Sequence, residues 1–363
     1  MSVIASISTA LPAYKHSQPD LGEFMAEFHA DSEQKKRKLK IMYSKSGISS
    51  RYSVIPDYSS GKEERVFFPK THNLEPFPSI EYRMQYFNKA ALPLCIEAIE
   101  KCIKEKVLSS QITHLISVSC TGLSAPGLDI DIVQFLKLNP AINRTSINFM
   151  GCYAAIHGLK MADQIVKSDP SSRVLVVCTE LCSLHYQKTF TENTLTAPLI
   201  FGDGSAAVLV CADDYPKKGI RLNSFHSEVM KEASDSMTWD ISATGFVMTL
   251  SAEIPGIFKA DIGKMSQNAL AKAGFSTDDI KYWCIHPGGK RILEAISHGL
   301  NLTNEDMASS FKILREYGNM SSATILFVLK DIWEKTGEEK GAPIFGVAFG
   351  PGLTMESLVM TIV

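Results

Sequence analysis

Three side chains that could act together in catalysis stand at the ends of predicted elements. Cys152 comes directly after a predicted buried strand over 145–150 and Gly151, at the first turn of a predicted helix that continues over 153–163. A thiol in that position meets unsatisfied backbone N–H groups and the positive end of the helix dipole, and both favour the thiolate. The placement therefore predicts a nucleophilic cysteine.

A histidine and an asparagine are placed in a comparable way. His286 ends a predicted strand before Pro-Gly-Gly, and Asn319 precedes an apolar helix predicted over 324–333. If His286 lay protonated beside Cys152, it would hold the thiolate as an ion pair. Taken alone, Cys152 could be a small buried hydrophobe, His286 a turn residue and Asn319 an ordinary N-cap. Their joint occurrence at element ends, where scaffolds usually present chemistry, favours a catalytic group.

Five short segments occur in an order and at intervals that match one protein family. They are Gly-Cys at 151–152, Leu-Ile-Phe-Gly-Asp-Gly at 199–204, Ile-His-Pro-Gly-Gly at 285–289, Tyr-Gly-Asn-Met-Ser-Ser at 317–322 and Phe-Gly-Pro-Gly-Leu-Thr at 349–354. In these segments the chain resembles the type III polyketide synthases, which include the chalcone synthases and their bacterial relatives.

The resemblance implies a role for each of the three residues. Cys152 would load the acyl group from a CoA thioester, and sulfur suits this exchange because it is a good nucleophile near neutral pH. His286 and Asn319 would act on malonyl-CoA, whose decarboxylation puts negative charge on the thioester oxygen. Two donors aimed at that oxygen would stabilise it by roughly 3 kcal/mol each. No metal and no redox cofactor is expected.

The fold class follows from the pattern of apolar runs. Short β-rich runs at 116–119, 174–178 and 206–211 alternate with amphipathic helical stretches, which predicts an α/β architecture with buried sheets. The resemblance implies a thiolase-like fold, with duplicated αβαβα halves stacked in five layers and two chains in a homodimer. A polar stretch near 213–218 places the boundary between the halves, 1–215 with the cysteine and 216–363 with the histidine and asparagine.

The resemblance also assigns the substrate site, residue by residue. Phe201 matches a phenylalanine that gates the CoA tunnel, and Met248 stands where plant members have a second gating phenylalanine. The remaining positions assigned to the cavity are Cys120, Cys182, His185, Trp239 and Ser321. His185 and Trp239 replace small residues of plant enzymes, which predicts a narrowed or redirected pocket. Cys120 replaces a common threonine; it is either a buried thiol or, as in some bacterial members, a participant in priming.

The basic run over 35–40 has two interpretations. It could be a solvated helix face, and in the family this region meets the phosphates of CoA, at positions that align with Lys38 and Lys45. Lysine suits phosphate as a flexible point charge. Ile41 replaces a family arginine, so the docking of CoA is expected to differ in detail.

The departures from the plant pattern argue against a chalcone product. A fatty acyl-CoA starter that gives alkyl pyrones or alkylresorcinols is preferred, because such a chain threads a narrow tunnel. Priming by malonyl-CoA alone, with a tetrahydroxynaphthalene or phloroglucinol product, stays open. A fatty-acid ketoacyl synthase is a lesser alternative, since it typically has His-Gln-Ala-Asn where this chain has His-Pro-Gly-Gly at 286–289. A nucleotide site at 202–207 is disfavoured because the segment leads into a strand.

Composition agrees with a soluble enzyme of 363 residues, of which 45% are hydrophobic. The net charge of −2 predicts no nucleic-acid partner, and no apolar run is long enough for a membrane span. Cys178 and Cys182 have the wrong spacing for a zinc knuckle, so no metal site is expected. Eight cysteines without a signal peptide favour a reducing compartment, and thus the cytoplasm.

Overall fold

One sheet of nine strands forms the centre of the protein, and a short pairing of two strands joins its two parts, which are called the two sheets below. The computed structural model describes residues 1–30, 32–188, 195–214, 218–336 and 339–363. Nine strands are hydrogen-bonded in the order β11-β12-β13-β8-β1-β7-β6-β4-β5. The first five in sequence are β1 (Ser2–Ala10), β4 (His114–Ser119), β5 (Asn143–Asn148), β6 (Val174–Leu181) and β7 (Asp203–Ala212); the others are β8 (Ile220–Val229), β11 (Tyr282–Ile285), β12 (Pro343–Gly350) and β13 (Thr354–Ile362).

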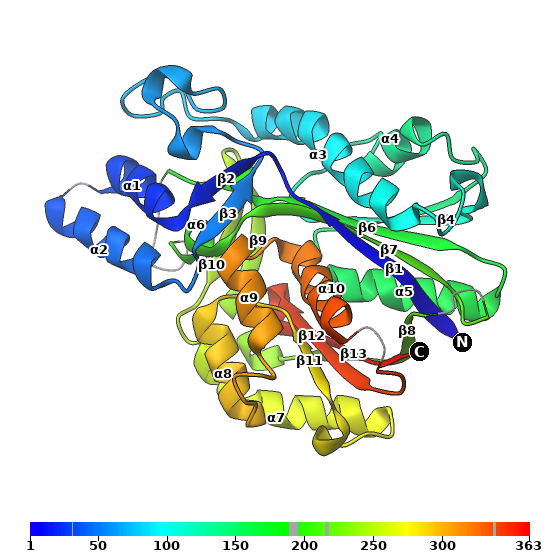
Figure 1. The fold of residues 1–363 in the computed structure, drawn as a ribbon. Coiled ribbons are helices and arrows are strands. Elements are labelled where there is room, and N and C mark those ends of the chain that lie inside the picture. The colour runs from blue at the N-terminus through cyan, green and yellow to red at the C-terminus, as the bar shows by residue number, and fades with distance from the viewer. Residues whose placement is uncertain (31, 189–194, 215–217, 337–338) are drawn as a thin grey trace.

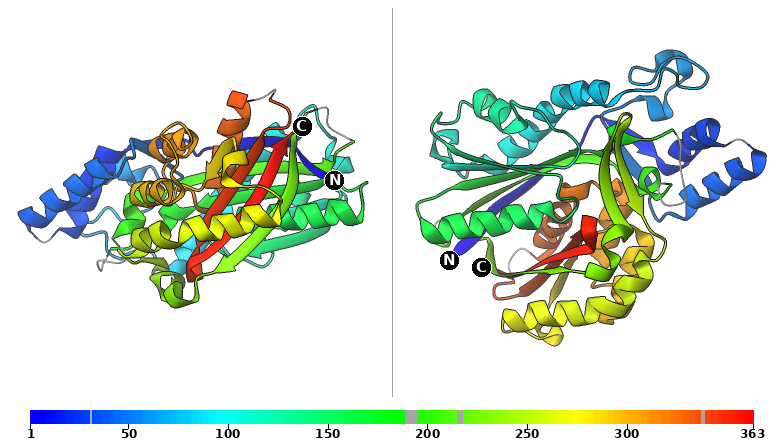
Figure 2. Two further views of the ribbon diagram at one scale, coloured as in Figure 1. Left: turned by 90° about the horizontal axis from the view of Figure 1, so that it is seen from below. Right: turned by 180° about the vertical axis from the view of Figure 1, so that it is seen from behind.

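Helices cover both sheets and also fill the space between them (Figures 1 and 2). The central layer consists of α5 (Ala154–Ser168) and α10 (Thr324–Thr336), which contact strands of both sheets. One outer layer holds α3 (Ile80–Ile103) and α4 (Leu128–Phe135), and the other holds α7 (Ile254–Lys272) and α8 (Lys290–Leu300). This stacking of helices, sheet, helices, sheet and helices confirms the predicted thiolase-like fold.

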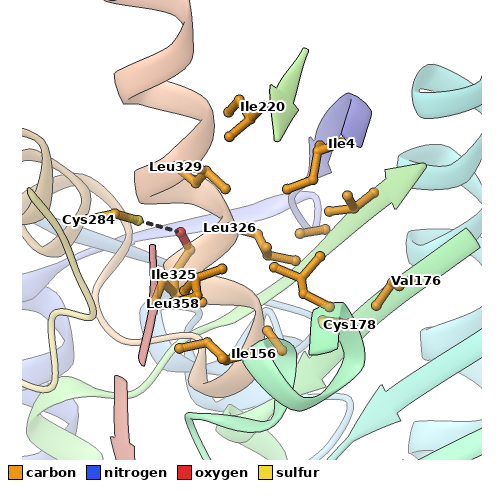
Figure 3. Close-up of a cluster of buried hydrophobic side chains, with 14 of the residues drawn as sticks. Ile4, Ile156, Val176, Cys178, Ile220, Cys284, Ile325, Leu326, Leu329 and Leu358 are labelled. Carbon is orange, nitrogen blue, oxygen red and sulfur yellow. Dashed lines mark hydrogen bonds between the residues drawn. The ribbon is translucent and has the colours of Figure 1, made fainter. Parts of the chain in front are cut away.

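The central layer is held by a mainly apolar core (Figure 3). Ile156 of α5 and Leu326 of α10 are almost completely buried, and they face Val176 of one sheet and Leu358 of the other. Each such side chain stabilises the fold by about 1.5–3 kcal/mol relative to exposure. The two halves therefore share one core, which fixes the helix ends where the candidate catalytic residues stand.

The remaining helices and strands do not belong to these layers. They are β2 (Tyr14–Ser17), α1 (Gln18–His29), α2 (Glu33–Lys45), β3 (Ser50–Ser53), α6 (Thr196–Ile200), the hairpin of β9 (Met237–Ser242) and β10 (Gly245–Leu250), and α9 (Ala308–Tyr317). Within the described ranges, none of the helices has the length and apolar character needed to cross a bilayer.

Two local predictions were wrong and one falls outside the structure. The strand predicted as buried over 145–150 is β5, which lies at the edge of the sheet with most residues exposed or partly exposed. The helix predicted from Cys152 begins at Ala154, so Cys152 belongs to the turn before α5. The boundary predicted between 215 and 216 lies outside the described residues. The other strands named from the sequence are confirmed as β4, β6, β7 and β11.

Candidate active site

The structure brings Cys152, His286 and Asn319 to one small cavity. Cys152 comes from the turn before α5, His286 follows β11, and Asn319 lies between α9 and α10. All three are buried, with exposed fractions of 5%, 2% and 2%. The cavity holds about 20 Å³, which is room for about one water molecule. The three residues therefore face a cavity with little room for water.

The turn that carries Cys152 depends on glycine at position 151. Gly151 has φ of +83°, and a Cβ atom there would lie 2.2 Å from Cδ of Pro351. Any other residue would be strained and would clash. Behind this turn, the Gly151 N–H donates to the sulfur of Cys120 over 3.0 Å. The loop that contains Pro351 thus acts as a scaffold that presses against the cysteine turn.

The side-chain amide of Asn319 has a fixed orientation. Its Oδ1 accepts hydrogen bonds from the Ser321 backbone N–H at 2.8 Å and from the Thr324 hydroxyl at 3.3 Å. Its Nδ2 lies 3.9 Å from the sulfur of Cys152. Its Oδ1 lies at the same distance of 3.9 Å from the sulfur but is already engaged by Ser321 and Thr324, so the N–H₂ group is the part of the amide left to donate in the cavity. The helical segment that follows has Met320 and not Asn319 at its N-cap.

The charge state of the resting site differs from the predicted ion pair. Burial raises the pKa of Cys152 to about 12, although the hydroxyl of Ser321 opposes this, and the nearby Glu180 raises it further. Burial lowers the pKa of His286 to about 3, and neither ring nitrogen has a hydrogen-bond partner among the described residues. Both shifts run against the predicted ion pair, because loss of hydration penalises the charged form of each group. They favour a neutral thiol and a neutral imidazole in the site without substrate.

This charge state predicts how fast Cys152 is alkylated in the absence of substrate. With a raised pKa, the thiolate fraction at pH 7 is small, and it grows about tenfold for each pH unit below the pKa. The rate of carbamidomethylation by iodoacetamide should therefore rise steeply from pH 7 to pH 9. Peptide mass spectrometry isolates Cys152 from the seven other cysteines. A rate that does not change over this range would show that Cys152 is already a thiolate at pH 7, as in the predicted ion pair with His286.

A larger, mainly apolar cavity of about 60 Å³ adjoins the first. Phe201 and Met248 line both cavities, so they lie at the boundary between them, as expected of gating residues. The larger cavity is also lined by Cys182, His185 and Trp239, and on its far side by Leu21 and Met25 of α1 and by Tyr58 and Tyr186. The space beyond the gate therefore runs toward α1.

His185 forms part of a rigid aromatic wall. Its Nε2 lies 2.7 Å from the Thr121 carbonyl oxygen, and its Nδ1 accepts from the Phe246 N–H at 3.0 Å. The ring stacks on Phe246 with 4.2 Å between centroids, and burial lowers the pKa of His185 to about 3. Trp239 packs edge-on against it and donates from Nε1 to the Cys120 carbonyl at 2.8 Å. With both nitrogens engaged, His185 shapes the cavity and does not act as a base.

The other positions assigned from the sequence do not line either cavity in the described structure. Cys120 lies behind the cysteine turn, and Ser321, with φ of +48°, has its hydroxyl close to Cys152. Lys38 and Lys45 are exposed on α2. Of the described residues, no group of three or more His, Cys, Asp or Glu side chains could hold a metal ion.

Sequence reasoning missed Glu180, a buried carboxylate that joins the segments behind the site. It accepts hydrogen bonds from the Cys120 N–H at 2.9 Å, the Thr121 hydroxyl at 2.8 Å and the Ser322 hydroxyl at 2.5 Å. These bonds compensate for burying a carboxyl group. A signal was present in the sequence, because a glutamate near the end of an otherwise apolar strand, β6, needs partners.

Comparison with known proteins gives the same assignment over the whole chain. The family model for the N-terminal domain of chalcone and stilbene synthases matches residues 1–214, and the model for their C-terminal domain matches residues 221–363.

Relatives match over nearly their full length. The alpha-pyrone synthesis polyketide synthase-like Pks18 of Mycobacterium tuberculosis is 30% identical over 100% of this chain and 92% of its own. Type III polyketide synthase C of Arabidopsis thaliana is 30% identical over 99% of this chain and 94% of its own. The crystal structure of PKS-I from the brown alga Ectocarpus siliculosus superposes with a TM-score of 0.92 at 30% identity, covering 100% of this chain and 98% of the alga's. The chain therefore belongs to the chalcone and stilbene synthase family and is a type III polyketide synthase, an acyl-transferring condensing enzyme.

Proposed function

We propose that this enzyme loads a fatty acyl group from CoA onto Cys152, extends it with malonyl-CoA and closes the product to an alkyl pyrone or alkylresorcinol. The observation that carries the starter class is the narrow apolar space beyond Phe201 and Met248, which runs toward α1. A flexible alkyl chain fits such a space better than a broad aromatic acid. The name of the mycobacterial relative, which refers to alpha-pyrone synthesis, supports the same product class.

Loading begins from the neutral thiol and imidazole. As the sulfur of Cys152 attacks the acyl-CoA carbonyl, its proton passes to His286, whose ring nitrogens have no other partner among the described residues. The new thioester forms on Cys152, and the CoA sulfur leaves as it regains a proton from His286. A neutral base of this kind activates a thiol without a resting thiolate.

Extension uses the other two members of the group. His286 and the Asn319 N–H₂ donate hydrogen bonds to the thioester carbonyl of malonyl-CoA, and loss of carbon dioxide leaves an enolate on that oxygen. The enolate carbon attacks the acyl carbonyl, the bond to sulfur breaks, and Cys152 leaves as a thiolate that takes its proton from water. In this scheme electrons and protons balance without a metal or a redox cofactor. Lys38 and Lys45 on α2 would meet the CoA phosphates as exposed point charges.

The proposal extends to the oligomeric state of the enzyme and to its location in the cell. We propose a homodimer, which is supported by the exposed edge strand β5 and by the neighbouring Phe135, 57% exposed at the end of α4. An unpaired edge and an apolar side chain beside it are typical of a surface that another chain covers. A cytoplasmic location is supported by the eight cysteines, all of which are free thiols.

The starter class is tested by mass spectrometry of the products of the purified enzyme. One reaction contains malonyl-CoA alone, and a series adds acyl-CoA starters of increasing chain length. We expect pyrone or resorcinol products only when a medium- or long-chain starter is present. Efficient product from malonyl-CoA alone would replace this proposal with the self-primed reaction, which the small volume of the cavity also permits.

Trp239→Gly should widen the range of accepted starters. The indole closes one side of the larger cavity, and its removal opens space that the rigid His185 and Phe246 pair cannot refill. We expect the kcat/KM ratio for an aromatic starter relative to an alkyl starter to rise about 10-fold or more, because an enlarged apolar pocket changes discrimination by about 1–3 kcal/mol. Competition between the two starters measures the ratio. An unchanged ratio would show that Trp239 does not limit the starter.

A further inference from the structure

A buried arginine lies beneath two of the segments that form the site. Arg51 belongs to β3 and is 5% exposed, although its side chain carries a permanent charge. Its Nη1 donates to the carbonyl oxygen of Phe201, and its Nε donates to Oε1 of Gln18 at 3.0 Å. Burial of a guanidinium costs free energy that its hydrogen bonds offset in part. Two of its nitrogens connect a gate residue to α1, and Nη2 has no hydrogen-bond partner among the described residues.

The stem of Arg51 also packs against the backbone on both sides of the site. A Cβ atom on Gly318 would lie 2.8 Å from Cδ of Arg51, and one on Gly202 would lie 3.4 Å from its Cβ. Gly318 precedes Asn319, and Gly202 follows Phe201. Only glycine allows the chain to approach the arginine this closely at position 318, where φ is +71°.

The two segments are also hydrogen-bonded to each other. The Gly202 N–H donates to the Asn319 carbonyl at 2.9 Å, and the Asn319 N–H donates to the Ile200 carbonyl at 2.9 Å. A displacement of the Phe201 carbonyl would therefore move the backbone of Asn319. Since the amide of Asn319 must be placed against a reacting carbonyl, such a movement would lower the rate of decarboxylation.

We propose that Arg51 is a positioning residue for decarboxylation: it fixes the 200–202 segment and, through it, the amide of Asn319. Arg51 also lines the larger cavity, but it does not contact the turn before α5 that carries Cys152 in the described structure. Loading of a short acyl group, which does not fill that cavity, should therefore depend on Arg51 much less. The inference rests on the proposed function, in which Asn319 acts in decarboxylation and Cys152 in loading. It predicts that loss of the guanidinium slows decarboxylation of malonyl-CoA and leaves acyl loading of Cys152 nearly unchanged.

The test measures the two half-reactions separately in Arg51→Lys. Acetyl-CoA formed from malonyl-CoA reports decarboxylation, and the mass added to Cys152 by a short acyl-CoA reports loading. We expect the kcat of decarboxylation to fall on the order of 10- to 100-fold, as for a misplaced catalytic group, with KM for malonyl-CoA within about twofold. Loading should proceed at close to the wild-type rate.

Arg83→Lys is the matched control. Arg83 is also completely buried, and its Nη1 donates to the carbonyl oxygen of Leu184. This control should lower the melting temperature as much as Arg51→Lys does but keep the kcat of decarboxylation. If Arg51→Lys does not fold, Gln18→Met removes the acceptor that holds Nε of Arg51, and a smaller fall in the same kcat is expected.

Three results would overturn the inference: an unchanged kcat in a folded Arg51 or Gln18 variant, an equal loss of kcat in Arg83→Lys, or loading and decarboxylation that fall in parallel. Failure of the proposed function is distinguishable from these. It would appear as a wild-type enzyme that releases no acetyl-CoA from malonyl-CoA.

Discussion

Cys152→Ala is expected to abolish polyketide formation while the decarboxylation of malonyl-CoA continues. The thiol is the group that would carry the acyl chain, and no product can form without it. Decarboxylation depends on His286 and the amide of Asn319, whose oxygen keeps its closer hydrogen bonds, from Ser321 and Thr324, when the thiol 3.9 Å away is removed. Chromatography of products from malonyl-CoA and a fatty acyl-CoA, together with acetyl-CoA release, measures both activities in one reaction.

Cys178→Ala is the control for this prediction. Cys178 is also a buried free thiol, but it lies in the core between the sheets (Figure 3). Its loss should cost some stability and leave product formation near the wild-type rate. Product formation by Cys152→Ala would contradict the assignment of the nucleophile.

Asn319→Ala is expected to lower the decarboxylation of malonyl-CoA by about 100- to 1,000-fold, which is typical of losing one oxyanion donor. Its Nδ2 is the amide donor that faces the cavity, 3.9 Å from the sulfur of Cys152. Loading of Cys152 should persist, because the thiol and His286 remain. Acetyl-CoA release and intact-protein mass spectrometry distinguish these two effects.

Asn223→Ala provides the comparison, since Asn223 donates to the Thr361 hydroxyl on the surface, remote from the cavity. We expect it to retain both half-reactions. Full extension by Asn319→Ala would refute the role given to the amide, because extension requires the enolate.

The three residues that line the small cavity could be singled out because each stands at an element end. Cys152, His286 and Asn319 could be found from residue type, flanking glycines and adjacent apolar runs. The alternation of these runs also predicted the α/β class correctly. Such signals are local, so they can be recognised in a single sequence.

Other features depend on contacts between distant segments. The pKa shifts of Cys152 and His286 result from burial on all sides, which no local pattern reports. The hydrogen bonds of Arg51 and Glu180 link residues that are 33 or more positions apart, so neither side chain could be given a role from sequence. The edge position of β5 was missed for a related reason, since an apolar run does not show how many neighbours a strand has.

The central claim is that the growing chain is carried on Cys152, and peptide-level mass spectrometry tests it most directly. The wild-type enzyme would be mixed with a fatty acyl-CoA, quenched and digested, and a second sample would receive malonyl-CoA before the quench. We predict an acyl mass on the peptide that contains Cys152, and its loss as product forms after malonyl-CoA is added. An acyl mass on Cys120 or Cys182 instead, or product formation without any acylated Cys152, would contradict the account.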